Sequence, residues 1–123
     1  MTIYVVILYW AFMMAKQRTY SRYARQAAIL MGEQIRLGRK QRRWTEKSLA
    51  DRAGISRATL QKIENGEMSS AIGLVFEVAT LVGVKLFESE TLPLSMHIEQ
   101  TRDKIALLPQ RIKTKKKDVY DDF

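Results

Sequence analysis

The 123-residue sequence contains no cysteine, two prolines and one histidine, His97. Without cysteine the chain has no disulfide, no thiolate for a metal ion and no cysteine nucleophile. A single histidine leaves the usual catalytic triads and multi-histidine zinc sites out of reach, and we expect His97 to face solvent or to pack. The composition therefore predicts a protein that is not an enzyme and holds no metal or cofactor. It is compatible with a reducing, cytoplasmic location.

An apolar run long enough to span a bilayer is also missing. Residues 1–12 are apolar, but a membrane-spanning helix needs roughly 20 such residues. No basic region precedes the run and no small-residue cleavage site follows it, which argues against a signal peptide. We favour the interpretation that translation starts at Met13 or Met14, because a cytoplasmic domain gains nothing from an exposed apolar leader. A short extra strand and an interfacial anchor are the alternatives.

Positive charge is abundant, and it is concentrated in one part of the chain. The net charge is +8. Residues 24–70 hold ten Lys and Arg against five Asp and Glu, whereas residues 71–98 hold one against three. Such a distribution is typical of a surface that faces phosphate, although a merely solvated basic face is the alternative.

The basic segment contains the pattern of two short helices joined by a tight turn. Thr45 and Ser56 stand where helix N-caps belong, and Gly54 suits the left-handed conformation at a helix C-terminus. A small residue at Ala50 allows close approach of the second helix. The pattern is a helix-turn-helix, whose usual ligand is DNA. We expect its inward-facing residues to be Leu49, Ala50, Ala53, Ile55, Leu60 and Ile63.

Further helices are expected on both sides of this motif. Residues 20–43 form one, with Gly32 and Gly38 explained by close packing. Ser69 or Ser70 caps the next, which buries Ile72, Val75, Phe76, Ala79 and Val82 and ends near Gly83. Residues 93–108 form the last helix. Its heptad-like stripe is a dimer seam or packs on the domain itself, and consists of Leu94, Ile98, Thr101, Ile105 and Leu108.

The predicted organisation has four parts. Residues 1–23 are an N-terminal extension, and residues 24–90 are the DNA-binding domain with its motif at 46–65. Residues 91–109 contain the C-terminal helix. Residues 110–123 form a basic tail that is expected to be disordered when free.

The motif also carries a family resemblance. Leu49-Ala50, Gly54-Ile55, Leu60 and Ile63, followed by Glu64-Asn65-Gly66, resemble the lambda-repressor/Cro (XRE) family over residues 31–87. The resemblance implies an all-α, five-helix DNA-binding domain that binds a palindromic operator in double-stranded DNA as a homodimer.

A narrower resemblance is to HipB-like antitoxins. Residues 53–64, residues 76–84 and the basic tail ending in Asp121-Asp122-Phe123 are similar to theirs. This implies a repressor of its own operon whose partner is a HipA-like serine/threonine kinase toxin. Two alternatives are a toxin-binding module with weak DNA binding and a stand-alone repressor of phage or plasmid type.

By position in the family, the base-reading residues are Ser56, Arg57, Ala58 and Lys62. Among them Arg57 is the best candidate to bond guanine O6 and N7 together. Thr45, Thr59 and Asn65 suit phosphate oxygens, and Arg43 and Lys47 are further phosphate contacts.

Two more positions follow from the resemblance. Many relatives carry glutamine where this chain has Glu46, so a DNA contact there is in doubt unless the carboxylate accepts a cytosine amine or pairs with Arg43 or Arg57. Arg39 and Glu64 match a partly buried ion pair that joins the first helix of the domain to the end of the recognition helix, which is the second helix of the motif.

Overall fold

All regular structure in the described part of the chain is helical. The computed structural model describes residues 2–15, 18–87 and 92–114. The chain divides into two compact units, Met1–Leu86 and Phe87–Phe123, each of which is described by itself. The six helices of the described ranges are α1 (Thr2–Ala15), α2 (Arg22–Gln41), α3 (Glu46–Ala53), α4 (Arg57–Glu64), α5 (Ile72–Leu81) and α6 (Leu94–Ala106).

This architecture confirms the expected all-α fold. Helices α2 to α6 are the five predicted helices, and α1 is an additional helix in the N-terminal extension. The alternative of a strand over residues 1–12 is therefore wrong. The segment contains no proline or glycine, and nothing in it interrupts the helix.

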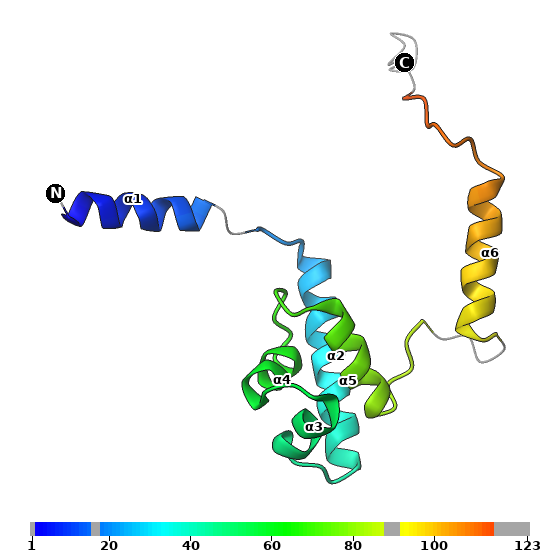
Figure 1. Cartoon of the computed structure of the whole chain (residues 1–123), viewed down its shortest axis with the longest axis horizontal. Coiled ribbons are helices and arrows are strands. Elements are labelled where there is room, and N and C mark those ends of the chain that lie inside the picture. Colours follow the sequence, from blue (N-terminus) through cyan, green and yellow to red (C-terminus); the bar gives the residue numbers. More distant parts are fainter. Residues whose placement is uncertain (1, 16–17, 88–91, 115–123) are drawn as a thin grey trace. The chain divides into compact units, whose positions relative to one another are not determined.

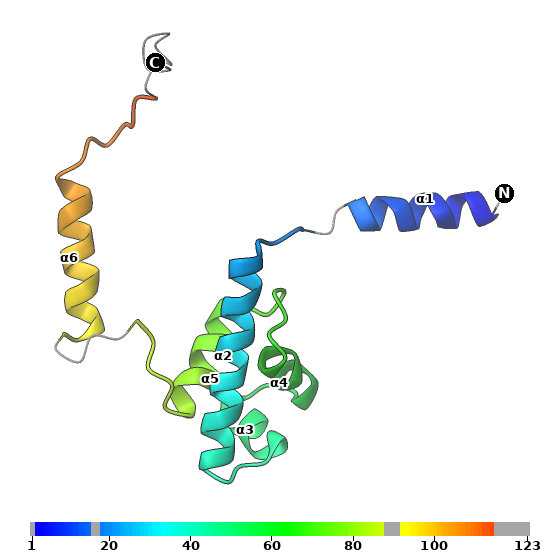
Figure 2. The ribbon, with the colours of Figure 1, turned by 180° about the vertical axis from the view of Figure 1, so that it is seen from behind.

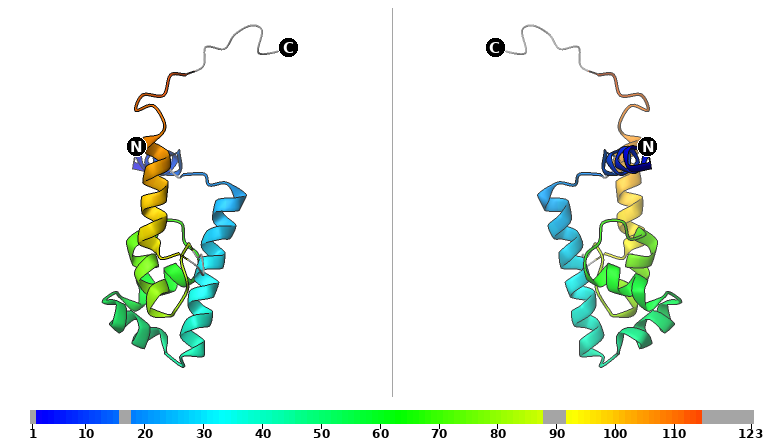
Figure 3. Two further views of the ribbon diagram at one scale, coloured as in Figure 1. Left: turned by 90° about the vertical axis from the view of Figure 1, so that its right-hand side faces the viewer. Right: turned by 90° about the vertical axis from the view of Figure 1, so that its left-hand side faces the viewer.

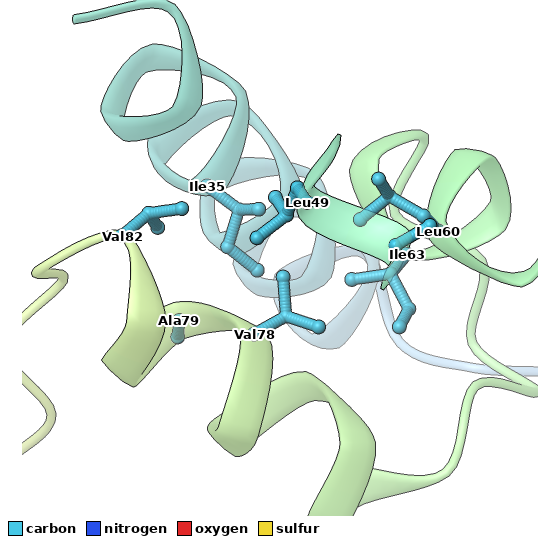
Figure 4. Close-up of a cluster of buried hydrophobic side chains, with 8 residues drawn as sticks. Ile35, Leu49, Leu60, Ile63, Val78, Ala79 and Val82 are labelled. Carbon is cyan, nitrogen blue, oxygen red and sulfur yellow. The ribbon is translucent and has the colours of Figure 1, made fainter. Parts of the chain in front are cut away.

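The domain core lies among α2, α3, α4 and α5. Helix α2 contacts α4 and α5, and α3 contacts the same two helices, so α4 and α5 each pack against both α2 and α3 (Figure 1). Helices α2 and α5 also lie side by side when viewed from behind (Figure 2). In the side views α2 runs along one edge of this unit (Figure 3). The buried side chains that fill the space are Ile35, Leu49, Ala50, Leu60, Ile63, Val78, Ala79 and Val82 (Figure 4).

Two glycines of α2 allow its backbone to touch its neighbours. A Cβ atom on Gly32 would lie 2.5 Å from the carbonyl oxygen of Glu64, and one on Gly38 would lie 2.7 Å from that of Val82. A Cβ atom and a carbonyl oxygen do not lie this close together, so a side chain at either position would force the backbone to shift. The expectation of close packing at both glycines is confirmed.

An ion pair fixes the end of α4 on α2. Arg39 donates from Nε to Glu64 Oε2 over 2.9 Å and from Nη2 to Oε1 over 3.0 Å, and its Nη1 bonds the carbonyl of Trp44. The side chains of Arg39 and Glu64 are only 9% and 2% exposed. The hydrogen bonding of Arg39 to Glu64 is the main reason that the pKa of Arg39 is raised. The expected pair is present, and Glu64 belongs to the scaffold.

The start of α5 differs from expectation. Its N-cap is Ala71, without a side-chain hydrogen bond, so neither Ser69 nor Ser70 caps this helix. Ile72 is 69% exposed, whereas Val78 is fully buried. Almost every residue of α5 is apolar, so periodicity alone did not define its inward face. The side chains that pack inward are Val75, Val78, Ala79, Leu81 and Val82.

Helices α1 and α6 both expose apolar side chains. Residues 2–11 of α1 are exposed throughout. In α6 no residue is buried, although His97 is half-buried. Residues 110–114 are exposed and lie outside any helix, while the rest of the predicted disordered tail lies outside the described residues.

Candidate nucleic-acid interface

The helix-turn-helix is formed by α3 and α4, and both N-termini are capped as expected. Thr45 Oγ1 accepts a hydrogen bond from the Ser48 amide over 3.0 Å, and Ser56 Oγ accepts one from the Thr59 amide over 3.1 Å. Gly54 ends α3 with φ +68°, the left-handed conformation that glycine adopts without strain. These local interactions set the turn that aims α4.

Helix α4 has one face in the core and the other in solvent. Leu60 and Ile63 are buried against α2 and α3. Arg57, Ala58 and Lys62 are exposed, as reading of base edges requires. The three predicted base-reading side chains on the helix itself are therefore accessible from outside, where α4 forms one edge of the unit (Figures 1 and 2).

The hydroxyls of Ser56 and Thr59 are engaged with one another. Their oxygen atoms lie 2.8 Å apart within hydrogen-bond geometry, in addition to the cap bond from the Thr59 amide. Thr59 is half-buried. Their first role is thus to hold the start of α4, although each oxygen keeps capacity for a further hydrogen bond.

Glu46 connects the N-termini of the two helices. Its Oε2 accepts hydrogen bonds from Arg57 Nε over 3.0 Å and from Gln61 Nε2 over 2.8 Å. These two bonds, with that from Gln61 the larger cause, lower the pKa of Glu46. The possible partner Arg57 is therefore the observed one. Sequence reasoning missed Gln61, although it is the next residue after Arg57 on the same face of α4, one turn further along.

Six of the basic side chains of the segment fall into two groups. Arg42 bonds the carbonyl of Val82, and the guanidinium of Arg52 lies 4.1 Å from the centroid of the Trp44 ring. With Arg39, these arginines stabilise the fold. Among the described residues no ion pair involves the other group, which is Arg43, Lys47 and Lys62.

The far end of α4 carries Asn65, which is exposed but engaged. Arg36 Nη2 donates to Asn65 Oδ1 over 2.9 Å and Arg36 Nε donates to Glu64. The Asn65 amide nitrogen remains as its donor. The contact of Arg36 with Glu64 and Asn65 was not predicted from the sequence. The neighbours of Arg36 on α2, Glu33 and Lys40, do not indicate that it would reach the end of α4.

Within the described ranges no cluster of three or more His, Cys, Asp or Glu side chains could hold a metal ion. The same ranges contain no helix with the length and apolar character needed to cross a membrane.

Two packed helices joined by a turn at Gly54, with Arg57 and Lys62 exposed on the second, form a helix-turn-helix, an arrangement that can place its second helix in the major groove of DNA. Residues 35–89, somewhat less than half of the chain, match the helix-turn-helix family model. The match supports a DNA-binding transcriptional regulator. No curated protein and no solved structure gives a match.

Proposed function

We propose that the chain is a sequence-specific repressor whose α4 enters the major groove of its operator. The observation that supports this most strongly is the division of α4, where Leu60 and Ile63 are buried while Arg57 is 65% exposed at the first turn. Arg57, Ala58 and Lys62 contact base edges, and the hydroxyl of Ser56 lies beside them at the helix start.

Phosphate contacts come from around this helix. Thr45 and Lys47 lie at the exposed start of α3, where amide groups and side chains together favour an anion. Arg43 precedes them with no ion-pair partner among the described residues. Thr59 and Asn65 complete the set through their remaining hydrogen-bonding capacity. These roles position the domain and carry no sequence information.

Selection of duplexes from a random pool, followed by a salt titration, tests this function. Specific binding should fall steeply as salt rises, because phosphate contacts release counterions. Lys47→Ala should weaken binding to all sequences alike and reduce the salt slope by about 1. Glu77→Gln, on α5 and outside the helix-turn-helix, is the control variant. Failure of the full chain to select any sequence would refute the proposal.

The proposed repressor is a homodimer on a palindromic operator. Two copies of α4 would enter successive major grooves roughly 34 Å apart. The exposure of Leu94, Ile98 and Ile105 on α6 supports a role for this helix in the seam. Ile98→Glu should then lower the apparent mass in sedimentation, whereas Gln100→Glu, off the stripe, should not. Equal masses for both variants would exclude α6 from the dimer.

We further propose that a HipA-like serine/threonine kinase toxin is the protein partner, and that the chain acts in the cytoplasm as its antitoxin. The support is the sequence resemblance over residues 53–64 and 76–84. If a kinase gene adjoins this one, co-expression should relieve its toxicity. Deleting residues after Pro109 should abolish neutralisation without affecting operator binding if the tail holds the toxin.

A stand-alone repressor would show operator binding and no effect on a neighbouring kinase. A toxin-binding module would neutralise the kinase and bind DNA only weakly and without sequence preference. Its Arg57→Ala variant would still neutralise the toxin.

A further inference from the structure

One acidic side chain, Glu46, lies beside the proposed base-reading residue Arg57. Glu46 is the first residue of α3, and it accepts hydrogen bonds from two side chains of α4 that lie one helical turn apart, Arg57 and Gln61. A carboxylate in this place opposes the attraction of the surface for phosphate, so its presence requires an explanation.

We propose that Glu46 is the specificity-determining residue of the interface: it orients Arg57 toward one guanine and reduces affinity for every other sequence. The proposal rests on the DNA-binding function proposed above and deepens it.

The orientation follows from which nitrogen is used. Glu46 Oε2 accepts from Arg57 Nε over 3.0 Å, so the two terminal nitrogens stay available on the outer side of the guanidinium. Those nitrogens are spaced to donate to O6 and N7 of one guanine. Gln61 fixes the same carboxylate oxygen over 2.8 Å, so the acceptor itself is held from the recognition helix. The Glu46 side chain is 31% exposed and that of Arg57 is 65% exposed, so Arg57 is the more accessible member of the pair.

The loss of affinity for other sequences follows from charge. The pKa of Glu46 is lowered by its two hydrogen bonds, and the carboxylate is ionised at neutral pH. On a duplex without the matching guanine, Arg57 must leave Glu46 in order to reach a phosphate, and an unpaired carboxylate then faces the DNA backbone. At the matching guanine Arg57 keeps both partners. One residue therefore favours the correct site and penalises the incorrect ones.

Binding of the full chain to two duplexes tests this. One duplex carries the selected operator, and the other replaces the single guanine that wild type requires at the Arg57 position. Glu46→Gln keeps an acceptor oxygen and removes the charge. We expect it to raise affinity for a random-sequence duplex about fivefold and to reduce the guanine preference about tenfold. The matched control Glu77→Gln removes one negative charge from an exposed position of α5 and should change neither quantity by more than about twofold.

Each other outcome contradicts a particular claim. An unchanged guanine preference in Glu46→Gln, or equal effects of Glu46→Gln and Glu77→Gln, would overturn the role of Glu46 while leaving DNA binding intact. Weaker binding of Glu46→Gln to both duplexes, with an unchanged thermal melt, would mean that Glu46 contacts DNA directly and would also overturn it. Wild type that selects no sequence would refute the proposed function itself.

Discussion

The two ends of α4 carry the same kind of ion pair in different surroundings. At the C-terminal end Glu64 bonds Arg39 through two nitrogens, and the two side chains are 2% and 9% exposed. At the N-terminal end Arg57 bonds Glu46 through Nε alone, and these side chains are 65% and 31% exposed. The buried pair is sheltered from water, and the exposed pair is screened by it.

This contrast separates stability from recognition along one short helix. The C-terminal end is bound to α2 by a charge pair and by direct backbone contact at Gly32. The N-terminal end is held by its cap at Ser56 and by the packing of α4 on α3, and its ion pair with Glu46 lies in solvent. In the proposed complex the buried end sets the direction of α4, and the exposed end contacts the bases. Substitutions at the two ends should consequently affect different measurements.

The largest effect is expected at the buried pair. Glu64→Ala leaves the Arg39 guanidinium buried without its partner, which should reduce the free energy of unfolding by about 3–5 kcal/mol. Denaturant unfolding of the purified chain measures this. Replacing both residues, as Arg39→Met with Glu64→Leu, should recover most of the loss. Glu33 is an exposed ion-pair partner of Arg36, and Glu33→Ala is the control. If Glu64→Ala lowers the free energy of unfolding no more than Glu33→Ala does, the two ends of α4 do not differ as proposed.

A smaller loss of stability is expected from Gly32→Ala. The added Cβ would lie 2.5 Å from the Glu64 carbonyl oxygen and 2.7 Å from that of Ile63, so α2 and the end of α4 must separate. We expect the free energy of unfolding to fall by about 1–3 kcal/mol, measured by denaturant unfolding. The matched control is Gly73→Ala in α5, where nothing lies within 4 Å of the new atom. The free energy of unfolding of Gly73→Ala should rise by about 0.4–1 kcal/mol. Equal changes for the two variants would contradict close packing at Gly32.

The exposed end should show the opposite balance. Arg57→Ala should weaken operator binding by about 1–3 kcal/mol and relax the preference at one base position. Its effect on folding should stay below about 1 kcal/mol, because an exposed ion pair contributes little. Parallel measurements of operator binding and thermal unfolding test the separation. Unchanged operator binding would remove Arg57 from the recognition surface.

The division between the two ends was partly predictable from the sequence. The caps at Thr45 and Ser56 and the turn at Gly54 depend on neighbouring residues, and local patterns fix them. The pairing of Arg39 with Glu64 came through the family resemblance. The inward face of α5 was not predictable, because Ile72 and Val78 are equally apolar and only the packing of α2 and α3 selects between them. The Gln61 contact likewise depends on how α3 crosses α4, which periodicity within either helix does not encode.

The smallest effect is expected in the titration of Glu46, which pairs with Arg57 at the exposed end of α4. Its folded-state pKa lies below the ordinary value of 4.5, so the stabilisation from its hydrogen bonds is present above that value and is lost as pH falls through the lower, folded pKa. Carbon-detected NMR of the carboxyl group should place the midpoint below 4.5. The hydrogen bond from Gln61 is the largest single cause, while Arg57 lowers the pKa through both its hydrogen bond and its charge, so Gln61→Ala and Arg57→Ala should each raise the midpoint. An unchanged midpoint in either variant would mean that the substituted side chain does not hold the Glu46 carboxylate in solution.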